Sequence, residues 1–170
     1  NFKANYENPS ANLITVDDTN LDYTADNLQE VAENTQVNLK YALIRDEKPE
    51  GTDGGTFTEG AWRTRDLNTI VQDEMGITLE NNQFTLPAGK YIIRASAPAY
   101  KVRNHIIKLE NIIDNISYIG TNAFSIDFTG GGVTTKSFLK IKLNITNQKI
   151  FEIQHQCDTT KSSNGFGEHS

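Results

Sequence analysis

Apolar and polar residues alternate with a period of two along most of the chain after residue 36. In KSFLKIKLNIT (136–146), every second residue from Leu139 to Ile145 is Leu or Ile, and Lys or Asn stand between them. Successive side chains of a strand point to opposite faces, so this pattern predicts a strand with one buried face. The outward face then carries Lys140 and Lys142.

Other stretches repeat the pattern at a spacing of roughly ten residues, with polar or glycine-rich turns between them. One turn is Pro87–Gly89, and TGGGVT (129–134) predicts a hairpin. The further strands are expected within 37–45, 90–97, 104–112, 112–119, 122–128 and 149–157. Many short strands with almost no helix predict an all-β protein, an antiparallel sandwich.

Residues 1–36 have a different character, polar and rich in Asn. Within them, LDYTADNLQEVAENTQ (21–36) predicts one short helix with Asp26 as its N-cap and a narrow apolar stripe that includes Leu28. A helix this short is marginal alone, so we expect it to pack against something, with a symmetry mate as the natural candidate. The chain thus divides into a neck, 1–36, and a β domain, 37–170.

Composition narrows the functional classes. The apolar share of 36% and the mean hydropathy of -0.52 predict a thin core, which a homo-oligomer would supplement. The net charge of -6 argues against nucleic-acid binding. No apolar run reaches the roughly 20 residues of a membrane helix, so membrane insertion is not expected. The first ten residues lack the basic start and apolar middle of a secretory signal peptide.

Candidate reactive residues are few. The single cysteine, Cys157, shares a strand face with His155, but this spacing creates no activating arrangement, so we expect a buried, inert thiol. His105, His155 and His169 lack ligand spacing, and structural or surface roles are favoured. One histidine from each of three chains around a symmetry axis remains an alternative. The acidic clusters at Asp17, Asp18 and Asp53 are interpreted as solvated turns rather than calcium sites, and no cofactor is expected.

The stretch GGTFTEGAWRTRDLNT (54–69) holds the only tryptophan. Its alternation predicts a structural strand in which Trp62 fixes the sandwich, while Arg63 and Arg65 pair with carboxylates within the chain or across a subunit boundary. The residues expected in the core or at a trimer interface are Leu28, Trp62, Tyr91, Phe138 and Phe151.

Three blocks in this order resemble a domain of tail fibre and related adhesion proteins of bacteriophages and some other large DNA viruses. They are GTDGGTFTEGAWRTRDLNT, ITLENNQFTLPAGKYIIRASAPAYKVRNHIIKL and FEIQHQCDTTKSSNGFG, and the resemblance covers roughly residues 40–167. YTADNLQEVAENT is similar to the short connecting modules that precede such tips. The resemblance implies a jelly roll of the complement and tumour-necrosis-factor type, a homotrimer at the end of a fibrous shaft, and no enzymatic activity.

The sequence departs from the family after NGFG. Family members usually continue there with a further strand rich in Val, Tyr and Ile, whereas this sequence stops at GEHS. Either that strand is missing from the chain, or the sheet closes differently. The departure concerns one edge of the sandwich and leaves the expected fold class unchanged.

The functional hypothesis is a non-enzymatic viral adhesin on the virion surface, extracellular, whose tip binds a host glycan or outer-membrane component. Loops carry such contacts at little cost to the core. The candidate contact residues are Asp53, Asn115, Tyr118, Asn122, Lys161 and Asn164. The alternative is a trimeric structural virion protein, namely a neck, head fibre or capsid decoration protein that binds other virion components. A depolymerase is less favoured, since such enzymes usually need a longer chain with two placed carboxylates.

Overall fold

The structure is a computed structural model that describes residues 39–128 and 131–168. The predicted helix with Leu28, the acidic pair Asp17 and Asp18, and His169 lie outside the described residues. Residues 41–170 form one compact unit. Throughout the described ranges the regular elements are strands, and the named strands all pair antiparallel. The all-β, antiparallel prediction is confirmed.

The larger sheet forms one layer of the unit. Its strands lie in the order β4, β5, β13, β7 and β8, with β2 paired to β13 and β9 paired to β7. The bounds are β2 Arg63–Thr64, β4 Thr78–Glu80, β5 Gln83–Leu86, β7 Arg103–Asn111, β8 Ile116–Ile119, β9 Ala123–Ser125 and β13 Lys149–Cys157.

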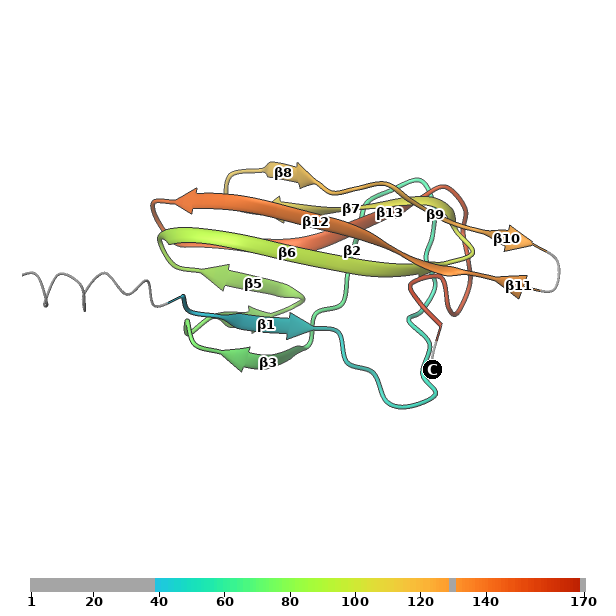
Figure 1. The fold of residues 1–170 in the computed structure, drawn as a ribbon, viewed down its shortest axis with the longest axis horizontal. Helices are drawn as coiled ribbons and strands as arrows, with labels where there is room; N and C mark the ends of the chain where they lie inside the picture. Colours follow the sequence, from blue (N-terminus) through green and yellow to red (C-terminus); the bar gives the residue numbers. More distant parts are fainter. Residues whose placement is uncertain (1–38, 129–130, 169–170) are drawn as a thin grey trace, which may run out of the picture. The chain divides into compact units, whose positions relative to one another are not determined.

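Two long strands, β6 (Gly89–Tyr100) and β12 (Thr134–Ile145), form a second layer and pair along their full 12-residue length. They run side by side from one end of the unit to the other (Figure 1). Two small sheets complete the unit: β1 (Ala42–Arg45) pairs with β3 (Thr69–Asp73), and β10 (Asp127–Phe128) pairs with β11 (Gly131–Gly132).

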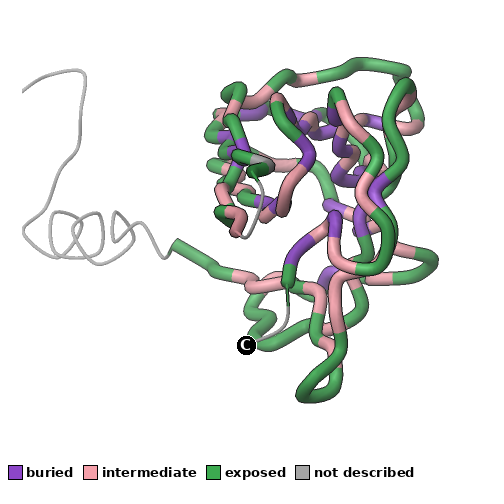
Figure 2. Tube along the Cα trace, turned by 90° about the vertical axis from the view of Figure 1, so that its right-hand side faces the viewer, coloured by how far each residue is buried: buried purple, intermediate pink, exposed green. Residues whose placement is uncertain are grey.

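The core lies between the two layers because each long strand turns its apolar residues inward. Leu139 faces Ala95 across the β6–β12 pair, and Leu143 faces Tyr91. From the other layer, the rings of Phe84 and Phe151 stack with centroids 5.7 Å apart. Along the Cα trace, buried stretches lie mostly toward the middle of the unit, and the outer loops are exposed (Figure 2). The main buried residues are Ile77, Phe84, Leu86, Ala97, Ile107, Leu109, Leu139, Leu143, Ile145, Phe151 and Ile153.

A second, smaller core lies beside the first at one end of the sandwich. Phe57, Ala99, Val102 and Cys157 are buried there, with Phe166 packed against them. Phe57 is fully buried, and full burial of such a side chain contributes about 2 kcal/mol. This core attaches the loops of that end to the strands.

Two of the residues expected in the core or at a trimer interface do not lie in the core. Trp62 is only half-buried, with the Lys108 ammonium 4.9 Å from its ring centroid. The strand that follows it, β2, has two residues and pairs with β13, and Phe57 fills the core instead. Phe138 is 54% exposed because its neighbour Leu139 takes the inward position.

The other two described members of that set pack as expected. Phe151 is fully buried, and Tyr91 is partly buried against the same core.

The edge of β6 that faces away from β12 is open along most of its length. Its last residue, Tyr100, donates its N–H to Gly165 O at 3.0 Å on that side. Backbone groups alternate between the two edges of an antiparallel strand, so Ser96, Arg94 and Ile92 present theirs to the same edge. No described strand pairs with them. Pro98 fits this edge because its missing N–H would point there.

Candidate functional site

The sandwich has two distinct ends. Tyr41, where the unit begins, lies at the proximal end, where its carbonyl accepts a hydrogen bond from Glu74 N at 2.9 Å. We call the opposite end the distal end (Figure 1). It consists of the β6–β7 turn, the β10–β11 pair and the segments 52–59 and 158–167.

Backbone hydrogen bonds hold the two distal segments together although about a hundred residues separate them in sequence. Phe57 and Lys161 exchange two such bonds, each 2.9 Å long. Gly55 N donates to Ser163 O at 2.8 Å, and Thr159 N donates to Val102 O at 3.1 Å. The loops therefore have fixed positions relative to the β6–β7 turn.

Gly165 permits the closest approach in this region. A Cβ at that position would lie 2.6 Å from Lys161 O and 2.7 Å from Phe57 Cβ. Both are shorter than real Cβ contacts, and one neighbour is backbone that cannot rotate away. Close packing therefore requires a glycine at position 165, the first of the two glycines in NGFG.

A stack of three side chains supports the distal loops. The rings of Phe57 and Phe166 lie 4.2 Å apart, and the Arg65 guanidinium lies 4.4 Å from the Phe166 centroid. Both terminal nitrogens of Arg65 donate to Phe166 O, at 3.2 and 3.3 Å. Burial lowers the pKa of Arg65 to about 10.

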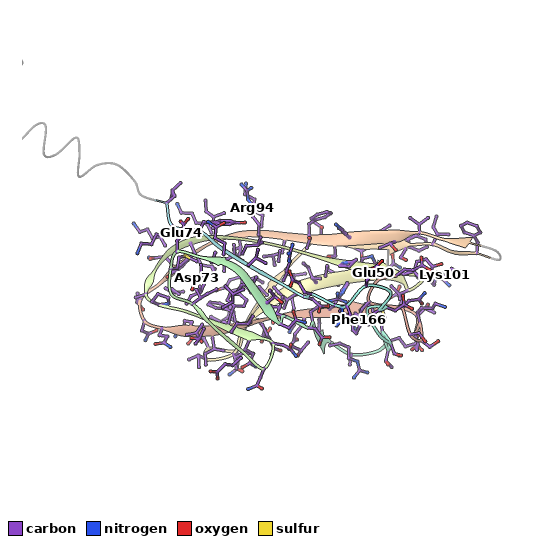
Figure 3. All side chains as sticks on the ribbon, turned by 90° about the horizontal axis from the view of Figure 1, so that it is seen from below. Glu50, Asp73, Glu74, Arg94, Lys101 and Phe166 are labelled. Carbon is purple, nitrogen blue, oxygen red and sulfur yellow. The ribbon has the colours of Figure 1, made fainter. Side chains whose placement is uncertain are left out.

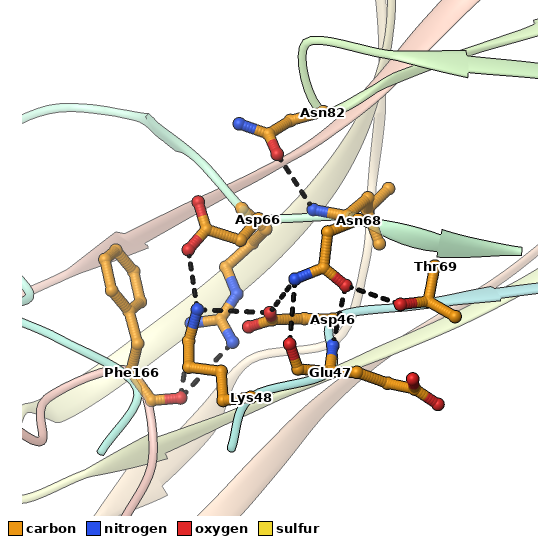
Figure 4. A network of polar contacts seen from close by, with 10 residues as sticks. Asp46, Glu47, Lys48, Asp66, Asn68, Thr69, Asn82 and Phe166 are labelled. Atoms are coloured by element: carbon orange, nitrogen blue, oxygen red, sulfur yellow. Dashed lines mark hydrogen bonds and ion pairs between the residues drawn. The ribbon is translucent and has the colours of Figure 1, made fainter. Parts of the chain in front are cut away.

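Neither arginine pairs with a described carboxylate of its own chain, and pairing across a subunit boundary stays a prediction. Arg65 donates to a backbone carbonyl, and Arg63 Nε donates to Thr58 O at 3.4 Å. The nearby carboxylates of Asp46 and Asp66 instead bind Lys48, at 3.1 and 2.9 Å (Figure 4). The hydrogen bond from Lys48 to Asp66 raises the pKa of Lys48.

The same network joins the end of β1 to the start of β3. Asn68 Nδ2 donates to Glu47 O at 2.9 Å, and Glu47 N donates to Asn68 Oδ1 at 2.8 Å (Figure 4). Asn82 Oδ1 accepts from Leu67 N at 3.1 Å. Exposed ion pairs contribute little to stability, so the network chiefly fixes the course of this loop.

Two histidines that are far apart in sequence meet beneath the distal loops. His105 of β7 and His155 of β13 are both buried, and their Nδ1 and Nε2 atoms lie 2.9 Å apart. His105 Nε2 is 2.8 Å from Thr135 Oγ1. Burial lowers the pKa of His105 to about 4 and that of His155 to about 2, so both are neutral at pH 7.

One placement of the ring protons on the two histidines leaves the smallest hydrogen-bonding deficit among their buried nitrogens. If His155 Nε2 donates to His105 Nδ1, His105 Nε2 donates to Thr135 Oγ1. Only the lone pair of His155 Nδ1 is then without a partner. A lone pair left unpaired costs less than a buried N–H left unpaired. The pair is thus a structural link between β7, β13 and β12.

Cys157, the single cysteine, is buried at the edge of this region. Burial raises the pKa of the Cys157 thiol to about 11, and its Sγ lies 3.4 Å from Thr159 O. This thiol is protonated at neutral pH, in line with the predicted buried cysteine. Within the described ranges, no three His, Cys, Asp or Glu side chains converge as a metal site would require.

The six predicted contact residues do not form one site. Asp53, Lys161 and Asn164 belong to the joined distal segments, where Gly55 bridges to Asn164 and Phe57 to Lys161. Asn122 lies close by, with Nδ2 3.4 Å from Asn104 Oδ1.

The other two lie away from the distal loops. Asn115 is in the β7–β8 turn, at the far end of β7 from the distal loops, and adopts a φ of 53°. Tyr118 lies in β8 opposite Leu109 and is partly buried against the core. Chain topology, rather than sequence, separates these two from the distal group.

Sequence analysis missed an exposed apolar cluster at the distal end. Its members lie on or beside β9, β10 and β11 and are 44–52% exposed. The alternation of residues 124–128 was visible in the sequence, but it gave no sign that the segment extends beyond the sandwich. The members are Phe124, Ile126, Phe128 and Val133.

Comparisons with known proteins give no family assignment. The chain matches no protein-family model, and a search of curated proteins gave no match either. In the described part of the chain, no helix has the length and apolar character needed to cross a bilayer.

Proposed function

We propose that this protein is a non-enzymatic attachment domain of a viral tail or surface fibre, a homotrimeric jelly roll whose distal end binds a molecule on the host cell surface. The observation that carries the proposal is the distal end itself. Loops held by backbone hydrogen bonds lie there beside exposed Phe124 and Phe128, opposite the end at which the unit begins.

The distal apolar cluster supports a binding role. Soluble proteins seldom leave several large apolar side chains exposed together unless the surface has a partner. Aromatic residues are enriched at binding surfaces because they bury much area with few rotatable bonds. Asn122 and Lys161 are polar residues of the same end, and we assign them to a rim that orients a ligand.

Incomplete burial of the core supports association into a trimer. Ala42, Ile44, Ile93, Ala95 and Ile141 pack against the core but remain only partly buried. Ile93 and Ala95 belong to β6, whose open edge adds to this surface because exposed sheet edges favour pairing with other chains. Three copies would also multiply weak receptor contacts into useful avidity.

Adsorption of the purified 170-residue protein to a panel of bacterial strains tests the proposal. The variant Phe124→Ser/Phe128→Ser should lose adsorption and the ability to compete with infection. The control Val71→Ser/Ile113→Ser removes equally exposed side chains elsewhere and should retain both. If the unaltered protein neither adsorbs nor competes, the structural virion role is favoured instead.

Two further measurements bear on the remaining parts of the proposal. Light scattering at micromolar concentration should give the mass of a trimer, and a stable folded monomer would contradict that assembly. Release of reducing sugar ends from host polysaccharide would contradict the absence of enzymatic activity.

A further inference from the structure

The outward face of the β6–β12 pair is strongly basic. Its outward residues are Lys90, Ile92, Arg94, Ser96, Pro98 and Tyr100 of β6 and Thr134, Lys136, Phe138, Lys140, Lys142 and Asn144 of β12. The cations among them are Lys90, Arg94, Lys136, Lys140 and Lys142, all exposed, and none of the twelve is acidic. We call these five cations with Ile92 and Phe138 the basic face.

The cations of the basic face form no ion pair with any described residue, unlike several lysines elsewhere. Lys48, Lys108 and Lys149 each bind a carboxylate within 3.1 Å. Arg94 projects away from the strand layers (Figure 3). Within the described residues, the five cations of the basic face therefore have no carboxylate partner.

Two of these cations stand directly opposite each other. Arg94 pairs in register with Lys140. Because the backbone of Tyr100 bonds away from β12, the register makes Arg94 and Lys140 a non-hydrogen-bonded pair. Side chains approach most closely in such pairs, with Cα atoms about 4.5 Å apart. Like charges in this position destabilise a sheet, so an external anion would relieve a repulsion already present in the fold.

We infer that the basic face binds a linear acidic polysaccharide. Its charge is complementary to a polyanion, and outward residues along one strand repeat about every 6.7 Å, which suits charges spaced along a chain. Ile92 and Phe138 are 66% and 54% exposed and offer apolar surface to sugar rings between the charges.

This binding goes beyond the proposed attachment at the distal end and is independent of it. The basic face lies along the length of the sandwich, whereas the proposed receptor contact lies at its tip (Figure 1). Acidic polysaccharide would hold the protein near a cell envelope by weak, salt-dependent contacts. A tip receptor would then supply specificity.

Binding to heparin and to polygalacturonate, measured by calorimetry at two salt concentrations, tests the inference. The 170-residue protein should bind both polymers, and more weakly as salt rises. The variant Arg94→Gln/Lys140→Gln/Lys142→Gln should bind about tenfold more weakly, since each exposed pair contributes a small increment. The control Arg45→Gln/Arg63→Gln/Arg103→Gln loses the same charge elsewhere and should bind as the unaltered protein does.

Lysine acetylation supplies a second readout that needs no variant. Heparin should protect Lys140 and Lys142 from acetylation while leaving the exposed Lys40 reactive. Equal affinity of the triple variant and the control, or equal protection of Lys40, overturns the inference. A triple variant with altered oligomeric mass, together with no binding by the unaltered protein, assigns the face to contacts between copies and overturns it as well.

The outcomes separate this inference from the proposed function. A protein that adsorbs to cells but binds neither polymer retains the attachment role and loses the polysaccharide site. A protein that binds the polymers but adsorbs to no strain retains the site and loses the attachment role.

Discussion

His105 and His155 are fifty residues apart in sequence, yet their imidazole nitrogens lie 2.9 Å apart between β7 and β13. Phe57 covers the pair, with its ring centroid 4.7 Å from that of His155. Among the described residues, no carboxylate is hydrogen-bonded to either ring, and the Arg65 guanidinium further lowers the pKa of both. The fold accommodates this pair only in its neutral form.

Stability should therefore fall in mild acid. Both folded-state pKa values, about 4 and about 2, lie below the unfolded value near 6.5, so the unfolded chain binds more protons. The contribution is fully present above pH 6.5 and is lost as the pH falls toward 4. Two such groups predict a loss on the order of 2–3 kcal/mol per pH unit between pH 6 and 4.5. Urea unfolding at pH 7, 6, 5 and 4.5 measures it.

The variant His105→Gln/His155→Leu supplies the control for this pH dependence. It should be less stable at pH 7, since packing and two hydrogen bonds change, but its stability should vary much less between pH 6 and 4.5. An unchanged slope in the variant would show that the histidines are not the groups responsible.

Glu152 gives a second prediction, because its buried carboxylate is held by neutral donors alone. Its two oxygens accept from Thr64 Oγ1 at 3.1 Å, from Gln83 Nε2 at 2.9 Å and from Gln154 Nε2. Glu152→Gln would place an amide N–H₂ against another donor and should cost about 1–3 kcal/mol. Chemical denaturation measures this, with the exposed Glu80→Gln of neighbouring β4 as a control expected to change little.

The distal loops give a third prediction. Gly165→Ala should displace the segment around Phe166, because the added Cβ would meet Lys161 O and Phe57 Cβ. We expect a loss of about 1–3 kcal/mol and faster proteolysis within 158–167. Ser162→Ala, at an exposed position of the same loop, should change neither. If Gly165→Ala resists proteolysis as the unaltered protein does, the close packing of this loop is not required.

The sequence predicted strands well where apolar residues alternate over many positions. The inward set from Leu139 to Ile145 in β12 and the buried run from Phe151 to Cys157 in β13 lie as the pattern indicated. Alternation is a direct consequence of the strand period, so it survives without knowledge of the partners. The same pattern already placed Lys140 and Lys142 outward.

Predictions failed where a side chain's partner is set by topology. Trp62 was expected in the core for its size, but the two-residue strand β2 pairs with β13 and leaves it half-buried. The sequence left open which candidate loops share an end, and the direction of β7 carries Asn115 and Tyr118 away from the distal loops. The meeting of His105 and His155 depends on the β7–β13 register, which no local pattern encodes.

Arg65 gives the last prediction, and it distinguishes the guanidinium from a simple positive charge. Arg65→Lys keeps the charge but cannot stack flat on Phe166 while donating twice to its carbonyl, and it would bury an ammonium without a carboxylate partner. We expect a loss of about 1–3 kcal/mol in unfolding free energy and greater exposure of the 163–167 backbone to hydrogen exchange. The matched change Arg63→Lys, at an exposed position of β2, should alter stability by less than about 0.5 kcal/mol. Equal effects of the two substitutions would mean that the stack of Phe57, Phe166 and Arg65 does not hold the distal loops.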